Sequence, residues 1–185
     1  MILKRSRYRF ELFVIFSITV ACYHTSLHAS DEVEKAGDVL QYLIPAAAYG
    51  ATFYFEDPDG RVQFYKSFVA NLSITYGLKE IINKNRPNGS GSEKSFPSAH
   101  TSGAFQGATY IHRRYGFKYA IPAYLASTLV GYSRVQSDEH YTSDVIAGAV
   151  IGIASSFYFT KKYKQFEIEP SVENGSYGLL ISRKW

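Results

Sequence analysis

Two cations in the middle of the chain have the spacing of an anion-binding pair. Lys79 and Arg86 are seven residues apart, nearly two turns of an α-helix, so both side chains can point to the same side. Two aligned cations favour a doubly charged phosphate, and an Arg fork can bind two of its oxygens. Alone, the pair indicates little, because such residues more often complement a helix dipole or are simply solvated.

A second group of polar residues follows at Pro97-Ser98-Ala99-His100. Proline and serine predict a helix start, where unpaired N–H groups and positive potential favour an anion. The Ser98 hydroxyl and the amides of Ala99 and His100 are therefore candidates for an anion cradle, with His100 able to protonate a departing oxygen. By itself, this group is more typical of an ordinary N-cap and a partly exposed histidine.

The third group consists of Arg134, His140 and Asp144. His140 and Asp144 are four residues apart and hence on one helix face, where the carboxylate can accept the imidazole Nδ1–H and leave Nε2 free to attack. Arg134 precedes the expected loop 135–139 and can turn back toward the same point. Taken singly, the His–Asp pair is again more typical of a surface hydrogen bond.

The three groups together resemble a known signature. Their order and spacing are Lys79-x6-Arg86-Pro87, then Pro97-Ser98-Ala99-His100, then Ser133-Arg134-x5-His140-x3-Asp144. This pattern resembles that of the type 2 phosphatidic acid phosphatase superfamily, which also contains bacterial nonspecific acid phosphatases and vanadium haloperoxidases. The resemblance covers about residues 60–160 and leaves both ends of the chain outside it.

The resemblance implies an α-helical bundle with the three motifs at one end. It implies that His140 is the nucleophile that forms a phosphohistidine, that Asp144 positions it, and that His100 is the acid and then the base. Phosphate binding is implied for the remaining motif positions, namely Lys79, Arg86, Ser98, Ala99 and Arg134. Ala99 departs from the family, which usually has Gly there, and its methyl group would add bulk beside the phosphate.

The segments that must position these residues read as helices. Five apolar segments are expected at about residues 32–56, 62–84, 97–114, 118–132 and 141–159. Asp57-Pro58-Asp59-Gly60 predicts a turn, and the Pro- and Gly-containing stretch 85–92 predicts a loop. The small residues of 148–156 predict close approach by another helix. With the N-terminal apolar run, this gives an all-α bundle of five to six helices.

The two ends of the chain differ from this bundle. Alternating apolar residues flank Asn174-Gly175, which predicts a β-hairpin over residues 165–185. Lys4, Arg5, Arg7 and Arg9 precede the apolar run 12–23, and small residues near Ala29 follow it, as in an export signal. The predicted division is therefore a signal peptide or anchor at 1–30, a phosphatase domain at 31–164 and a tail at 165–185.

Charge and composition exclude some classes of partner. Of the formal net charge of +4, the first eleven residues contribute three, and residues 31–185 are near neutral, which argues against a nucleic-acid-binding surface. The single Cys22 allows no internal disulfide, and no His, Cys or carboxylate cluster has metal-ligand spacing. We therefore expect no metal and no cofactor.

The sequence allows two membrane topologies. The interior segments mostly fall short of the roughly 20 apolar residues of a membrane span, and Lys66, Asn71, Lys79 and Glu80 interrupt them. The mean hydropathy of −0.15 also argues against spans. We therefore expect an exported domain that is either soluble in the periplasm or associated with the membrane surface that faces it. An integral inner-membrane protein with six spans is the alternative.

The sequence predicts a metal-independent phosphatase acting on a phosphomonoester or pyrophosphate, with a phosphorylated lipid favoured as the substrate. A broad-specificity periplasmic acid phosphatase acting on small soluble phosphomonoesters is the alternative enzyme, and a vanadate-dependent haloperoxidase a more distant one. An envelope structural or binding protein that retains the fold is the non-enzymatic alternative.

Overall fold

The structure, a computed structural model, describes residues 31–163, 166–173 and 176–183. The expected signal or anchor at 1–30 and the expected Asn174-Gly175 turn lie outside these residues. Five α-helices are described: α2 (Asp31–Tyr54), α3 (Pro58–Ile81), α4 (Ala99–Tyr115), α5 (Phe117–Gln136) and α6 (Thr142–Phe159). The all-α prediction is confirmed, and each helix overlaps one of the five expected segments.

The helix starts show why the chain divides where it does. Asp57 caps α3, its Oδ1 accepting the N–H of Gly60 at 2.9 Å, and Pro58 occupies the first turn, where its missing N–H costs nothing. Asp59 and Gly60 are therefore already helical, and the connection from α2 is shorter than the turn predicted at 57–60. Pro97 lies just before the Ser98 N-cap of α4, and not within the first helical turn as expected.

A single glycine separates α4 from α5. Gly116 has φ of 113°, a conformation that side-chain-bearing residues rarely adopt, and its N–H bonds back to the carbonyls of Ile111 and His112. This sharp reversal sends α5 back alongside α4. Helix α5 then extends to Gln136, so Arg134 lies in its last turn and not before a loop beginning at residue 135.

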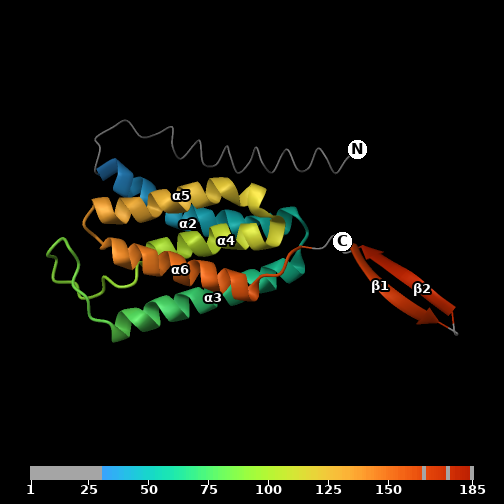
Figure 1. Cartoon of the computed structure of the whole chain (residues 1–185). Coiled ribbons are helices and arrows are strands. Elements are labelled where there is room, and N and C mark those ends of the chain that lie inside the picture. Colours follow the sequence, from blue (N-terminus) through green and yellow to red (C-terminus); the bar gives the residue numbers. More distant parts are fainter. Residues whose placement is uncertain (1–30, 164–165, 174–175, 184–185) are drawn as a thin grey trace.

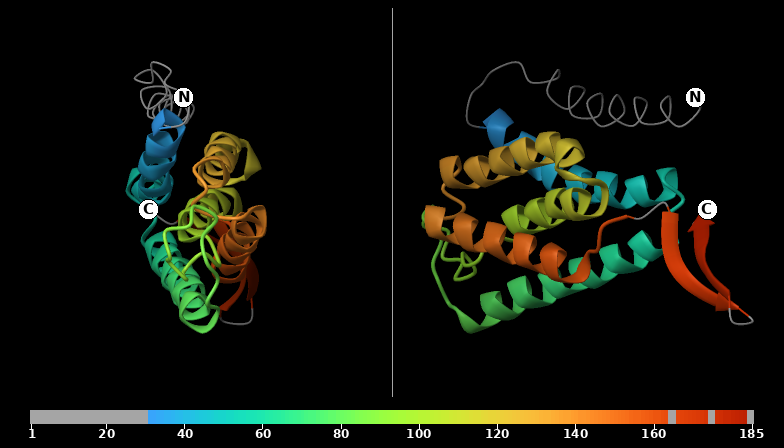
Figure 2. Two further views of the ribbon diagram at one scale, coloured as in Figure 1. Left: turned by 90° about the vertical axis from the view of Figure 1, so that its left-hand side faces the viewer. Right: turned by 45° about the vertical axis from the view of Figure 1, so that its right-hand side comes forward.

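Helix α4 is the central element of the bundle. It packs against α2, α3, α5 and α6, as the view along the bundle in Figure 2 also shows. Helices α2, α4 and α6 run in one direction and α3 and α5 in the other (Figure 1). The ends of α3 and α5 therefore lie beside the starts of α2, α4 and α6.

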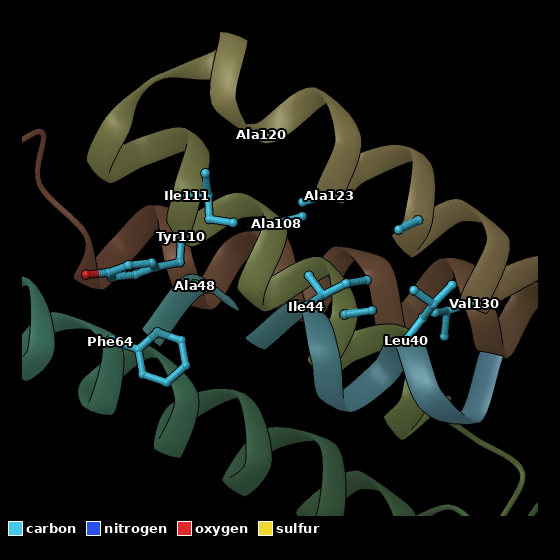
Figure 3. Packing of buried hydrophobic residues seen from close by; sticks show 12 residues of the cluster. Leu40, Ile44, Ala48, Phe64, Ala108, Tyr110, Ile111, Ala120, Ala123 and Val130 are labelled. Atoms are coloured by element: carbon cyan, nitrogen blue, oxygen red, sulfur yellow. The ribbon is translucent and has the colours of Figure 1, made fainter. Parts of the chain in front are cut away.

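The core between these helices is built largely from small side chains. Of the thirteen buried hydrophobic residues in the described part of the chain, seven are alanine and only six are larger. Figure 3 shows how residues of this core pack around α4. The buried hydrophobic residues are Leu40, Ile44, Ala48, Ala51, Phe64, Ala104, Ala108, Tyr110, Ile111, Ala120, Ala123, Ala126 and Val130. Small residues allow the helix backbones to approach closely.

Two glycines of α6 show how close this approach is. A Cβ at Gly152 would collide with the Ser102 carbonyl and lie 2.7 Å from the Gln106 nitrogen, and one at Gly148 would collide with the Ser98 carbonyl. The predicted close approach at residues 148–156 is thus confirmed, with α4 as the partner. The contact fixes the start of α6 against the start of α4.

A buried ion pair closes the opposite end of the bundle. The Asp57 carboxylate accepts from Arg114 Nε at 2.6 Å and from Tyr115 Oη at 3.1 Å. Arg114 Nη1 also donates to the Lys161 carbonyl at 2.9 Å. These bonds tie the α2–α3 connection, the end of α4 and the segment after α6 together.

The outer surface of the helices is apolar. Large hydrophobic side chains are exposed on α2, α3, α5 and α6, including Tyr42, Val69, Leu125, Val150 and Tyr158. By length and composition, α6 is the one described helix that could cross a membrane, which alone is weak evidence because buried core helices share these properties.

The tail contains two strands, β1 (Phe166–Glu173) and β2 (Ser176–Arg183). They pair antiparallel, with Phe166 opposite Arg183 and Glu173 opposite Ser176.

Candidate active site

Residues of all three sequence motifs gather at the end of the bundle where α3 and α5 finish and α4 and α6 begin (Figure 1). Lys79 lies in the last turn of α3, Ser98 caps α4, and Asp144 lies in the first turn of α6. Arg86 lies in the loop before α4, and His140 in the loop before α6. Antiparallel helix directions thus bring together positions that are far apart in the sequence.

His140 and Asp144 are both buried and face each other. Their side chains are 3% and 0% exposed, and His140 Nδ1 lies 4.0 Å from Asp144 Oδ2. This distance is too long for the expected hydrogen bond. Among the described residues, Nδ1 has no hydrogen-bond partner. The two side chains that the sequence predicts to pair therefore lie side by side, but they are not hydrogen-bonded in this structure.

The environment of His140 keeps its imidazole neutral. Burial, followed by the charges of Lys79 and Arg86, lowers the pKa of His140 from 6.5 to about 4, whereas the Ser95 backbone and Asp144 act in the opposite direction. A neutral imidazole has a lone pair available for attack on an electrophile.

Asp144 also links the segments that carry the motifs. Its carboxylate accepts from Lys84 Nζ at 2.5 Å and from Ser95 Oγ at 2.6 Å, and its backbone carbonyl accepts the N–H of Ser98 at 3.0 Å. Lys84 further lies over the ring of Tyr141, 4.4 Å from its centroid. Sequence reasoning missed Lys84, although its place two residues before Arg86 was a usable signal.

Lys79 and Arg86 approach the site from different elements. Lys79 is 7% exposed. Its ammonium donates to the Lys94 carbonyl at 2.7 Å, which ties it to the segment between α3 and α4. Arg86 forms an ion pair with Glu139, the residue before His140. Arg86 Nε is buried and has no acceptor in the described part of the chain. The Nε–H group of Arg86 is therefore a candidate donor to a bound anion.

Ser98 and Ala99 form the expected helix start. The Ser98 hydroxyl accepts from Thr101 Oγ1 at 3.0 Å and from Thr101 N at 3.4 Å, as an N-cap does. The amides of Ala99 and His100 have no acceptor within residues 31–163. They remain available for an anion, as the sequence predicts, while the Ser98 amide is already bound to Asp144.

Arg134 and His100 meet at a carboxylate of α2. Arg134 is 3% exposed, with Nη1 lying 2.9 Å from Asp38 Oδ1, and His100 Nε2 lies 3.3 Å from the same oxygen. Sequence reasoning did not single out Asp38. Its position on the first, poorly patterned turns of a helix gave no signal.

The donors at this end of the bundle are cations, imidazoles and amides. No group of three or more His, Cys, Asp or Glu side chains in the described ranges is arranged to hold a metal ion. Lys79, Arg86 and Arg134 supply positive charge of the kind that stabilises a phosphoryl group in the transition state.

Comparison with known proteins identifies the family. The model of the PAP2 superfamily matches residues 64–167, more than half of the chain. The chain belongs to the PAP2 superfamily. All eight sequence-predicted site residues fall inside the matched segment, whereas α2, with Asp38, precedes it.

Individual PAP2 superfamily relatives span much of this chain. A lipid A 4'-phosphatase of Helicobacter pylori is 28% identical over 170 residues, covering 83% of this chain and 85% of the relative. A probable lipid phosphate phosphatase 4 of Arabidopsis thaliana is 33% identical over 137 residues, or 66% of this chain, but the match spans only 41% of the plant protein. The crystal structure of Aquifex aeolicus LpxE aligns with a TM-score of 0.59 at 20% identity, covering 78% of this chain and 92% of that one, and thus shares the fold.

Proposed function

We propose that this PAP2 protein hydrolyses the phosphate of a phosphorylated lipid through a phosphohistidine at His140. Its named relatives are phosphatases, so the reaction class follows from the family. The observation that carries the mechanism is the buried His140 ring, whose pKa is lowered by burial and by the adjacent Lys79 and Arg86. A neutral nucleophile beside fixed cations is what attack on a phosphate dianion requires.

In the proposed reaction, His140 Nε2 attacks phosphorus while the bond from phosphorus to the leaving oxygen breaks. His100 donates its proton to that oxygen. Lys79, Arg86, Arg134, the Ser98 hydroxyl and the Ala99 amide bind the phosphoryl oxygens, and Asp144 stabilises the cationic His140 ring. His100 then takes a proton from water, whose oxygen attacks phosphorus, and the P–N bond breaks to release inorganic phosphate.

A lipid substrate is supported by the surface of the bundle. Buried positions on α3 and α4 are often polar, such as Ser67, Asn71, Thr75, Ser102 and Gln106, while large apolar residues face outward. Residues of this kind between helices and apolar residues outside are typical of membrane bundles. We infer that the bundle is embedded in a bilayer, which favours the spanning alternative over a membrane-skimming domain.

The kinds of exposed side chain also vary along the helix axes. Aliphatic residues such as Val69, Leu125 and Val150 are exposed in the middle of α3, α5 and α6. Aromatic side chains are exposed nearer the ends, as expected for residues at the two membrane interfaces. They are Tyr76, Tyr132 and Tyr141 toward the site, and Phe53, Tyr54, Phe117, Phe157 and Tyr158 toward the opposite end, whereas the exposed Tyr42 and Tyr65 lie nearer the middle of α2 and within α3.

Helix length is compatible with this embedding. The 24 residues of α3 and the 20 of α5 correspond to about 36 and 30 Å, against a hydrocarbon core of about 30 Å. The site would then lie at one membrane surface, where a lipid phosphate is found. Lys66, exposed on α3, can extend its ammonium toward the opposite surface.

Among lipid phosphates, the 4'-phosphate of lipid A is our first candidate. The support is the Helicobacter pylori relative, whose match covers most of both chains. Phosphatidylglycerol phosphate, polyprenyl pyrophosphate and phosphatidic acid are the competing candidates. We further propose that residues 1–30 direct export or form a sixth span, that the site faces the periplasm, and that 165–185 form a hairpin tail outside the catalytic unit.

A phosphate-release panel tests the function. Purified full-length protein in detergent is given lipid A, the three competing lipids and a soluble aryl phosphate, with His140→Ala as the control. Turnover of a lipid that is lost in the variant supports the proposal. Turnover of the soluble ester alone would favour the broad-specificity phosphatase.

Membrane embedding has a separate test. Membranes from expressing cells are washed with alkaline carbonate, which strips proteins held only at the surface. We expect the protein to remain in the pellet, and its release into the supernatant would contradict embedding.

A further inference from the structure

We propose that Asp38 of α2 is a positioning residue that holds His100 and Arg134 in their reactive orientations. The proposal rests on the phosphatase function proposed above. A single carboxylate oxygen, Asp38 Oδ1, lies 2.9 Å from Arg134 Nη1 and 3.3 Å from His100 Nε2. One atom therefore sets the distance between a phosphate-binding cation and the acid of the reaction.

Helix α2 can reach this position because of Gly37. A Cβ at Gly37 would lie 2.8 Å from Ser133 Cβ and 3.1 Å from Arg134 Nη2. Contacts that tight leave no room for a side chain, so only glycine lets α2 approach α5 this closely. The next residue, Asp38, is thereby placed beside the guanidinium.

Contacts within the protein occupy only some of the N–H donors of Arg134. Its Nη2 donates to the Glu34 carbonyl at 2.8 Å, its Nε to Ser133 Oγ at 3.1 Å, and its Nη1 faces Asp38. A guanidinium has five N–H donors, so these three contacts leave two for a phosphoryl group. Asp38 can therefore stay in place while Arg134 binds substrate, which distinguishes a positioning residue from a competing anion.

For His100, the contact selects which ring nitrogen reacts. When Nε2–H donates to Asp38, the Nδ1 atom is the one that can exchange a proton with the substrate. Burial and the charges of Arg134 and Arg86 disfavour the imidazolium that a general acid requires, and Asp38 is the group that acts in its favour. The Nδ1 proton passes to the leaving oxygen in the first step, and Nδ1 accepts one from water in the second, while the Nε2–H bond to Asp38 persists.

The kinetic test uses leaving-group dependence. Wild type, Asp38→Asn, Asp38→Glu and the control Glu32→Gln are compared on alkyl and aryl phosphates of falling leaving-group basicity. Glu32 lies on the same helix and pairs with Lys35. We expect Asp38→Asn to lower kcat on an alkyl phosphate about 10- to 100-fold, less than the 10²–10⁴ that a general acid supplies.

The loss should shrink to within about 3-fold on p-nitrophenyl phosphate, whose leaving group needs little protonation. KM should change little, Asp38→Glu should recover part of the activity, and Glu32→Gln should match wild type. An equal loss on all substrates, or tighter inhibition by inorganic phosphate with kcat unchanged, would overturn the proposal in favour of a structural or competing role.

A second readout does not need turnover. Nitrogen-15 NMR of the five labelled histidines, with His100→Ala to assign its signal, reports which ring nitrogen carries the proton. We expect the Nε2–H form of His100 in wild type and a mixture in Asp38→Asn. An Nδ1–H form in wild type would overturn the proposal, whereas the expected form in a protein that releases no phosphate would count against the function alone.

Discussion

Nδ1 of His140 and Oδ2 of Asp144 lie 4.0 Å apart, both buried, at the start of α6. The carboxylate is held away from the ring by its bonds to Lys84 and Ser95. A small rotation of the imidazole would form the Nδ1–H bond when positive charge develops on the ring. In the mechanism that we propose, this arrangement favours the cationic His140 ring that forms on attack, while the free ring stays neutral.

Replacing His140, the nucleophile that we propose, should abolish turnover and leave the fold intact. His140→Ala is expected to lower phosphate release by more than about 10³-fold. Thermal unfolding should change little, since Nδ1 has no hydrogen-bond partner to lose in the described part of the structure. Retention of activity would show that another group attacks phosphorus.

Asp144 should matter for stability as well as for rate. Asp144→Ala removes the acceptor for Lys84, Ser95 and the Tyr141 amide, and is expected to cost about 2–4 kcal/mol in the free energy of unfolding. Denaturant titration measures this cost. A variant as stable as wild type would mean that the three segments are held together by other contacts.

Lys84 should act on rate through Asp144. In Lys84→Met, the carboxylate loses its cationic partner and its fixed orientation, and we expect kcat to fall about 10-fold with KM nearly unchanged. Lys84→Arg should restore most of the rate because it keeps the charge. A rise in KM alone would instead indicate that Lys84 binds the substrate.

Protonation of His140 should set an acid limit to reactivity. With its pKa lowered to about 4, the ring is neutral above that pH and becomes protonated, hence unreactive, below it. Because Lys79 lowers this pKa, Lys79→Met should raise it and move the loss of neutral imidazole to higher pH. NMR titration of the His140 ring measures both values, and a midpoint near 6.5 in wild type would contradict the prediction.

The α4–α6 contact predicts different outcomes at two glycines. A methyl group at Gly152 would strike the backbone of α4, so Gly152→Ala should destabilise the fold by about 1–3 kcal/mol and reduce activity. Gly103, on α4, has nothing within 4 Å of an added Cβ, so Gly103→Ala should be neutral or slightly stabilising. Thermal unfolding of both variants provides the comparison.

Much of this arrangement could be predicted from local sequence signals. The Ser98 cap and the turn and loop signals at 57–60 and 85–92 located the helices to within a few residues, because such residues act on the backbone next to them. Pro58 was assigned to a turn, although it is the first residue of α3. The motif spacing also indicated the members of the site. Lys84 and Asp38 were missed because their roles depend on Asp144 and Arg134, which lie 60 and 96 residues further along the chain, and no local pattern encodes such contacts.

The outward-facing apolar residues were also hard to interpret from the sequence. Side chains such as Tyr42 and Leu125 read as ordinary core residues until the structure shows them exposed. Polar residues such as Asn71 and Lys79 interrupted the apolar runs and argued against membrane spans, yet both are buried between helices. Average hydropathy does not record which face a residue occupies.

Helix α2 lies before the segment shared with the superfamily, yet it packs against the site. The segment shared with the superfamily begins at residue 64, but Leu40, Ile44 and Ala48 fill the groove beside α4, and Asp38 reaches the reacting end. A chain trimmed to the shared segment would keep every motif residue while opening that groove and releasing Arg134 on one side. We therefore propose that the smallest active unit begins near residue 31, so that it includes α2.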